Sequence, residues 1–187
     1  MGQALRRFTS RDLELMPDDG KRREIIDGEL YVSKQPRFEH QFVNGLIWQA
    51  LHRWSVATNS GYAVVAPGLV FAEDDDVVPD VAWIGRDRLD AALDDAGHFR
   101  VAPDLIAEVL SPGRSNEERD REAKLKLYSR RGVREYWIVD WRTRQVEVYR
   151  RQGIGLEPVG MPGQGDSLES PLLPGFTVPV RELFAGL

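Results

Sequence analysis

The sequence predicts an α/β (α+β) fold in which a central mixed β-sheet is flanked by helices and preceded by an N-terminal β-hairpin. Short apolar runs separated by Gly, Pro and Asp recur along the 187 residues and are typical of strands. Residues 38–56 instead have apolar side chains at helical spacing, and residues 115–131 begin with a helix-capping pattern. No repeat or linker interrupts this alternation, so we expect a single domain over residues 1–187, with residues 1–19 as a helical lead-in.

The N-terminal part predicts a short helix and a hairpin ahead of the long helix. Thr9–Leu15 begins with a threonine and a serine, both of which cap helices well. Asp27 and Gly28 separate two short apolar runs, and both residues tolerate the positive φ that a tight hairpin turn needs. The helix over residues 38–56 follows directly.

The middle of the chain predicts three strands. Residues 62–71 are apolar around a Pro-Gly pair, which indicates one bent strand. Residues 77–84 form the second, where Pro79 favours an edge, a bulge or an early position. Residues 105–110 form the third and are apolar apart from one glutamate.

The C-terminal half predicts a helix, a hairpin and shorter elements. Ser115 and Glu118 fit a capping box, and Gly132 lies where the helix should end. The elements expected after it are a hairpin over residues 135–140 and 145–150, strands near 156–159 and 176–180, and a helical turn over 181–184.

Composition excludes several classes of protein. The chain has no cysteine, which excludes disulfides and thiolate metal sites. Its apolar runs are far shorter than the roughly 18 residues of a membrane span, and Met1–Phe8 lacks a signal-peptide core. We therefore expect a cytoplasmic protein with no membrane partner.

Charge is distributed unevenly along the chain. The net charge of −5 argues mildly against nucleic acid as a partner. Between Arg114 and Arg151, however, 12 Lys and Arg stand against 7 Asp and Glu, a net of +5, so the remainder carries −10. A basic sector beside an acidic site suits a nuclease, because phosphates must be attracted and metals held. The alternative is a helix and hairpin with ordinary solvated faces.

Two carboxylates interrupt apolar strands. Asp80 lies within residues 77–84, and Glu108 lies within residues 105–110. A carboxylate among Val, Ile and Leu is costly to bury without a cation, a metal or a proton. If the two strands are neighbours, both carboxylates can converge on one divalent cation. The alternative is that each is structural and hydrogen-bonds nearby backbone or an arginine.

Lys124 lies on the helix that follows Glu108, with Asp120 and Tyr128 four residues away on the same face. A lysine is a compact charge suited to steadying an attacking hydroxide or developing charge on a phosphate. The alternative is a surface Asp–Lys pair, worth about 0.3–0.5 kcal/mol, beside a half-buried tyrosine.

Glu24 and His40 are accessory candidates. Glu24 lies in the first hairpin, on a strand expected at the sheet edge, and would supply a further oxygen ligand. His40 lies at the start of the long helix, where it either reaches the site or caps the helix. His52 and His98 have no zinc-ligand spacing with it, so no zinc site is expected.

Several blocks of this sequence resemble a known family. They are Pro79-Asp80, residues 103–112 (PDLIAEVLSP), Asp120 with Lys124 and Tyr128, and residues 132–140 (GVREYWIVD), supported by residues 24–30 (EIIDGEL), His40-Gln41 and residues 173–176 (LPGF). In this combination they resemble the Uma-type restriction endonuclease family, which is assigned to the PD-(D/E)XK nuclease superfamily. The resemblance runs from about residue 20 to the end of the chain.

The resemblance implies a restriction-endonuclease-like core for the single domain. It also implies Mg²⁺-dependent cleavage of nucleic acid, with DNA the expected substrate, Asp80 and Glu108 as metal ligands, and Mn²⁺ able to substitute. Because many such enzymes cut duplexes as two-fold dimers, a homodimer is expected by analogy.

One position departs from the superfamily pattern. The third position of the acidic motif should be lysine but is Leu110, and Lys124 from the next helix is the natural replacement. Lys126 competes for that role from a different helix face. Asp104 forms a second Pro-Asp pair, but it lies about 13 Å along an extended strand from the motif glutamate, so Asp80 is preferred.

The sequence therefore predicts a metal-dependent endonuclease with Asp80, Glu108 and Lys124 as catalytic residues. The rival hypothesis is a catalytically inactive nuclease-fold binding or assembly module, which Leu110 and the acidic net charge favour. A third is a metal-dependent hydrolase of a small phosphoester.

Overall fold

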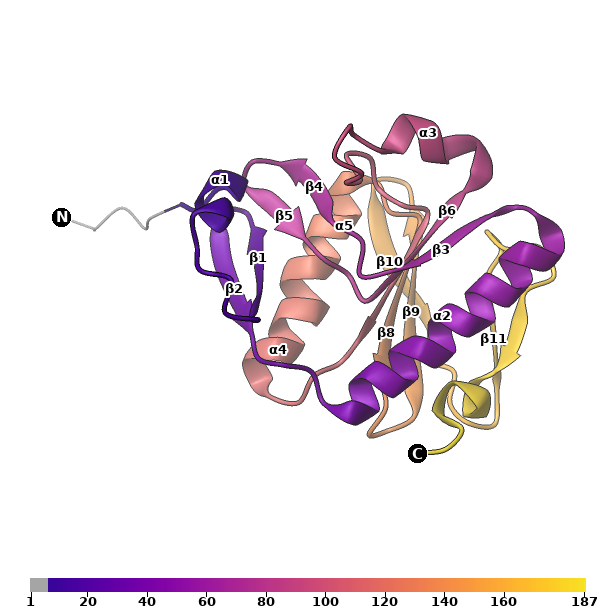
Figure 1. Cartoon of the computed structure of the whole chain (residues 1–187). Coiled ribbons are helices and arrows are strands. Elements are labelled where there is room, and N and C mark those ends of the chain that lie inside the picture. Colours follow the sequence, from indigo (N-terminus) through magenta and orange to yellow (C-terminus); the bar gives the residue numbers. More distant parts are fainter. Residues whose placement is uncertain (1–6) are drawn as a thin grey trace.

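The computed structural model describes residues 7–187, so the first six residues of the predicted lead-in lie outside the described chain. A six-stranded and a four-stranded β-sheet, a two-stranded ribbon and the helices packed on them make up the described part of the fold (Figure 1). The strands are β1 (Arg22–Ile26), β2 (Glu29–Ser33), β3 (Gly61–Val65), β4 (Leu69–Ala72), β5 (Asp75–Val77), β6 (Val81–Gly85), β7 (Leu105–Val109), β8 (Glu135–Asp140), β9 (Gln145–Gln152), β10 (Gly155–Gly160), β11 (Ser167–Glu169) and β12 (Thr177–Pro179). The helices are α1 (Ser10–Glu14), α2 (Phe38–Thr58), η1 (Arg86–Arg88), α3 (Leu89–Ala92), α4 (Arg114–Glu118), η2 (Arg119–Lys124), α5 (Leu125–Arg131) and η3 (Val180–Phe184).

The larger sheet has the strand order β10-β9-β8-β7-β6-β3. It is mixed, because β7 pairs with β8 in parallel and with β6 antiparallel. The helix that links β7 to β8 is the crossover that a parallel pair requires. A smaller sheet of order β2-β1-β5-β4 contains the predicted N-terminal hairpin, and β11 pairs with β12 as a separate ribbon.

Both faces of the larger sheet are buried, because neighbouring residues of a strand point to opposite faces. Trp83, Leu105 and Ala107 belong to the core beneath α2, whereas Ile84 and Ile106 belong to the core beneath α5. The runs around Asp80 and Glu108 are therefore apolar on both sides, as in sheets covered by helices on both faces. Figure 1 shows α2 and α5 on either side of the sheet.

Neither of the two long strands predicted over residues 62–71 and 77–84 is continuous. The first is divided between β3 of the larger sheet and β4 of the smaller sheet. In the second, residues 81–84 do form a strand of the larger sheet, β6, but Val77 is the last residue of β5 in the smaller sheet. The breaks lie at prolines: Pro67 follows Ala66, whose φ is 48°, and Pro79 has no N–H to donate to a ladder. Asp80 consequently lies at the junction between the two sheets.

The helix predicted over residues 115–131 is present but starts at Arg114 and is not a uniform α-helix. Gly113 is its N-cap residue, with φ of 117°, so the predicted capping box at Ser115 is wrong. Its central turn, η2, is a π-helix. By contrast, the capping threonine of α1 is confirmed, because the Asp12 side chain accepts a 2.8 Å hydrogen bond from the Thr9 backbone N–H. No helix within residues 7–187 is long and apolar enough to span a bilayer.

Candidate active site

The predicted site residues gather where the two sheets meet, between the start of α2 and the helix η2. Asp80, Glu108 and Lys124 are 2%, 2% and 0% exposed, so Lys124 is not part of the surface ion pair that was the alternative for it. Glu24 and His40 are also buried. The structure therefore brings all five sequence candidates into one region of the protein interior.

Glu108 and Lys124 are in direct contact. The Lys124 ammonium donates to Glu108 Oε1 at 2.8 Å, and the Tyr128 hydroxyl donates to the same oxygen at 2.8 Å. Glu108 points to this side because it shares a face of β7 with Ile106, above which the helix packs. Lys124 thus lies beside the motif glutamate, as expected for a lysine that replaces the one missing at Leu110.

Asp80 is held by three groups from three different parts of the chain. Its Oδ2 accepts a 2.9 Å hydrogen bond from the backbone N–H of Val109 and lies 3.1 Å from His40 Nε2. Its Oδ1 accepts from Arg22 Nη1 at 3.2 Å. The carboxylate of Asp80 is therefore anchored to the peptide unit directly after Glu108. His40 reaches the site and does not cap α2, whose N-cap residue is Arg37.

Glu24 joins the cluster from the smaller sheet. Its Oε1 accepts from Lys124 at 3.0 Å and from the Val78 backbone N–H at 3.0 Å. Strand β1 lies between β2 and β5, so the expectation that Glu24 occupies an edge strand is wrong. Within residues 7–187 its other oxygen, Oε2, is buried without a hydrogen bond and lies 3.8 Å from Arg119 Nη1.

Three further charged residues complete the cluster and were not predicted as site residues. Asp120 is 1% exposed, lies 3.9 Å from the Lys124 ammonium and accepts from Arg119 Nε at 2.9 Å. Arg22 contacts Asp80. The sequence did contain a signal for two of them. Arg22 is two residues from Glu24 on one strand face, and Asp120 is four residues from Lys124 on one helix face.

The π-helical turn contains both Asp120 and Lys124, and a tyrosine of β8 holds it against the larger sheet. The Tyr136 hydroxyl donates a 2.9 Å hydrogen bond to the backbone carbonyl of Asp120, and its ring packs edge-on against Tyr128 at 5.1 Å. Single π-turns inside helices often occur at functional sites. The tyrosine of the block over residues 132–140 therefore fixes the turn that presents the lysine.

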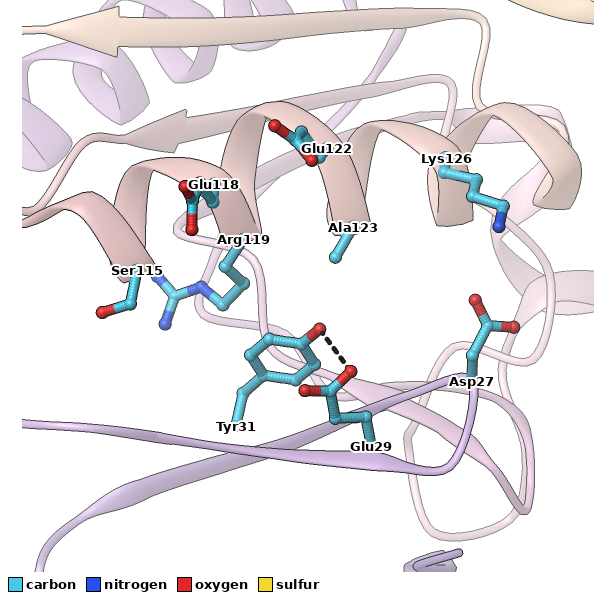
Figure 2. Close-up of a pocket in the computed structure, with 9 residues that line it drawn as sticks. All are labelled: Asp27, Glu29, Tyr31, Ser115, Glu118, Arg119, Glu122, Ala123 and Lys126. Carbon is cyan, nitrogen blue, oxygen red and sulfur yellow. Dashed lines mark hydrogen bonds between the residues drawn. The ribbon is translucent and has the colours of Figure 1, made fainter. Parts of the chain in front are cut away.

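Asp104 and Lys126, the residues that competed with Asp80 and Lys124 in the sequence, lie outside this cluster. Asp104 accepts from the Gly85 backbone N–H at 2.9 Å and pairs with Arg88 and Arg134. It thus holds the far ends of β6 and β7 together. Lys126 is exposed and lines a surface pocket between the hairpin and the helix, shown in Figure 2.

The surrounding charges set the protonation of the cluster. Burial opposes ionisation of Asp80, but the hydrogen bond from His40 and the charge of Arg22 outweigh it and lower the pKa of Asp80. Burial likewise opposes the Lys124 charge, yet Glu108 and Glu24 raise its pKa, so it stays an ammonium. The pKa of Glu24 is lowered, because Lys124 and Arg119 outweigh its burial.

Glu108 behaves differently from the other two acids. Burial raises its pKa most, Lys124 acts in the opposite direction, and the carboxylates of Asp80, Asp120 and Glu24 raise it further, to about 7. Two carboxyls with pKa values displaced in opposite directions are a common sign of a site that handles protons or metals.

This displacement predicts a pH-dependent stability. The folded-state pKa of Glu108, about 7, lies above its ordinary value of 4.5, so its contribution is fully present below pH 4.5 and lost as the pH rises through 7. Relative to Glu108→Gln, whose amide stays neutral, the wild type should lose about 3 kcal/mol of unfolding free energy between pH 4.5 and pH 8. Urea denaturation of both proteins in EDTA measures this. The raised pKa would be contradicted if the free energy of unfolding had the same pH dependence in the two proteins.

The donor set fits a hard divalent cation. Across residues 7–187 no group of three or more His, Asp or Glu side chains is placed to hold a metal unaided. Mg²⁺ does not need such a group, because it commonly uses one or two carboxylates with water and substrate phosphates. Asp80 and Glu108 are the two carboxylates that would serve in this way. The unbonded Glu24 Oε2 is a further buried oxygen beside them.

Comparison with known proteins identifies the family of the chain. A family model, Uma2, described as "Putative restriction endonuclease", matches residues 10–181. The chain belongs to the Uma2 family. All five predicted site residues fall within the matched region, and the resemblance inferred from the sequence blocks is confirmed. No curated protein matches the chain significantly.

A crystal structure of a "putative nuclease belonging to DUF820" from Anabaena variabilis ATCC 29413 is similar to this Uma2 protein. The TM-score is 0.76 at 19% identity, over 95% of this chain and 98% of that one. At this identity the similarity establishes the fold alone. It confirms the predicted fold, a mixed sheet flanked by helices.

Proposed function

We propose that this Uma2 protein is a Mg²⁺-dependent endonuclease that hydrolyses phosphodiester bonds of nucleic acid, with DNA as the substrate. The observation that carries the proposal is the buried contact of Lys124 with Glu108. The next residue after Glu108, Val109, donates its backbone N–H to the Asp80 carboxylate. The family description and the nuclease fold of the structural neighbour support the same activity. A homodimer stays a prediction by analogy.

Asp80 and Glu108 would hold the ion, and Glu24 is an accessory oxygen. A bound Mg²⁺ supplies a water of lowered pKa and offsets negative charge on the scissile phosphate. Lys124 keeps its proton and places a fixed positive charge beside Glu108, where it can orient a hydroxide and stabilise phosphate charge. His40 and Arg22 keep Asp80 ionised and oriented.

The rival hypothesis is a nuclease-fold module without catalysis. It is favoured by one observation, that the carboxylates of the cluster are already matched by the cations Arg22, Arg119 and Lys124. A metal ion would have to displace part of this network. The two hypotheses therefore differ in whether Mg²⁺ binds at all.

Calorimetry and a cleavage assay separate them. We expect Mg²⁺ to bind the wild type and to support cleavage of labelled duplex or single-stranded DNA, with RNA and a nucleotide phosphoester tested alongside. EDTA should abolish cleavage and excess Mn²⁺ should restore it. The endonuclease proposal fails if the purified protein binds neither metal and cuts none of these substrates.

A further inference from the structure

A groove opens on the surface next to the buried cluster. One wall is residues 32–37, which comprise the end of β2 and the segment linking it to α2. The other wall is the loop after β7, residues 111–113, with Ser115 and Asn116 at the start of α4. The cavity between them has a volume of about 490 Å³. Figure 1 shows these two connections at the same end of the molecule, beside α4. We call it the 32–37 groove.

Both walls of the 32–37 groove are joined by short stretches of chain to the acidic cluster. Residues 32–37 lead into α2, where His40 contacts Asp80. The loop begins just after Glu108 on β7, and the helix that follows it carries Lys124. Ser33 also accepts a hydrogen bond from Arg119, whose Nε contacts Asp120. The cluster residues themselves do not line the groove, but both of its walls are connected to them by short stretches of chain.

The charge of the groove suits a polyanion. Its lining contains Lys34 and Arg37 and no Asp or Glu. Lys34 is exposed, and Arg37, whose side chain is 62% exposed, pairs with Glu39 at 3.1 Å. An exposed pair of this kind is worth only about 0–1 kcal/mol, so a phosphate can replace the Glu39 carboxylate. The wall also offers the hydroxyls of Ser33, Ser111 and Ser115 as hydrogen-bond donors.

The pocket on the other side of Ser115 has the opposite character. It is lined by four acids, Asp27, Glu29, Glu118 and Glu122, against the two bases Arg119 and Lys126 (Figure 2). In Figure 2 the Glu118 and Glu122 side chains project from the helix on one side of this pocket, and Glu29 lies on the hairpin opposite. A phosphate chain approaching here would be repelled.

We propose that the 32–37 groove binds the phosphodiester backbone of the substrate strand and delivers it to the Asp80–Glu108 site, with Lys34 and Arg37 as the phosphate-binding residues. The inference rests on the proposed nuclease function. It places the nucleic-acid strand in the groove. The strand would approach from this side because the acidic pocket of Figure 2 repels polyanions.

The test is binding of a fluorescein-labelled oligonucleotide, measured by anisotropy in EDTA so that no strand is cut. Lys34→Glu/Arg37→Glu should weaken binding at least about tenfold and reduce the slope of log K against log salt by about 1–2, because two phosphate contacts are lost. Lys21→Glu/Arg53→Glu is the matched control, with the same residue types and charge change on exposed positions outside the groove. It should bind within about twofold of the wild type.

The outcomes separate this proposal from the nuclease function. Equal losses in the two double variants, or no binding by the wild type, would overturn the groove assignment. Cleavage by the wild type is scored in a separate Mg²⁺ assay. If the protein binds the oligonucleotide through Lys34 and Arg37 but never cleaves it, the endonuclease proposal is refuted and the groove assignment is supported.

Discussion

Asp80→Asn should reduce Mg²⁺-dependent cleavage at least about 100-fold at a temperature where the variant stays folded. The amide matches the carboxylate in size and its oxygen can still accept the Val109 hydrogen bond, but it loses the charge that binds a cation. It also leaves Arg22 and His40 without their counter-ion. Some stability should be lost too, so the rate is measured per folded protein, quantified by circular dichroism.

Asp104→Asn is the matched control for that experiment. Asp104 is also a buried aspartate after a proline, and it also pairs with two cations, Arg88 and Arg134. Removing its charge should cost similar stability but leave cleavage within a few-fold of the wild type. If both variants lose cleavage equally while folded, or if Asp80→Asn keeps it, Asp80 is not a metal ligand.

Lys124→Met should lower the free energy of unfolding by about 3–5 kcal/mol at pH 8 in EDTA. The methionine fills a similar volume, but Glu108, Glu24 and Asp120 lose their shared ammonium in an interior where the lysine is 0% exposed. The loss should shrink toward pH 5, because protonated carboxyls do not need a counter-ion. Denaturant titration at the two pH values measures the difference.

Lys126→Met, two residues away on the exposed side of the same helix, is the control. A surface substitution of this kind should change stability by no more than about 0.5 kcal/mol at either pH. Cleavage assays on both variants also decide between the two lysines proposed as replacements for the motif lysine. A stable Lys124→Met with full activity would remove Lys124 from the mechanism.

Much of the fold could be predicted because the local signals are strong. The Asp27-Gly28 hairpin, the apolar strand over residues 105–110 and the long amphipathic helix all follow from short-range rules, and each is present. The proximity of Glu108 and Lys124 could be anticipated because a strand and the helix after it usually pack together.

What could not be predicted depends on contacts distant in sequence. The division of residues 62–71 and 77–84 between two sheets could be predicted only if it were known that β1 and β2 form a sheet with β4 and β5. That arrangement places Glu24 beside Lys124, 100 residues later in the numbering, and Arg22 beside Asp80. The π-turn depends in part on Tyr136 holding the Asp120 carbonyl, a tertiary contact that no helix-capping rule describes.

The ionic cluster draws Glu24 from one sheet and Glu108 from the other, and Asp80 from the crossing between them. Glu108 and Lys124 pair with each other within the part of the chain that contains the six-stranded sheet, but Lys124 contacts Glu24, and Asp80 contacts Arg22, only when the smaller sheet is in place. The full set of ion pairs around these carboxylates therefore requires both sheets to be assembled.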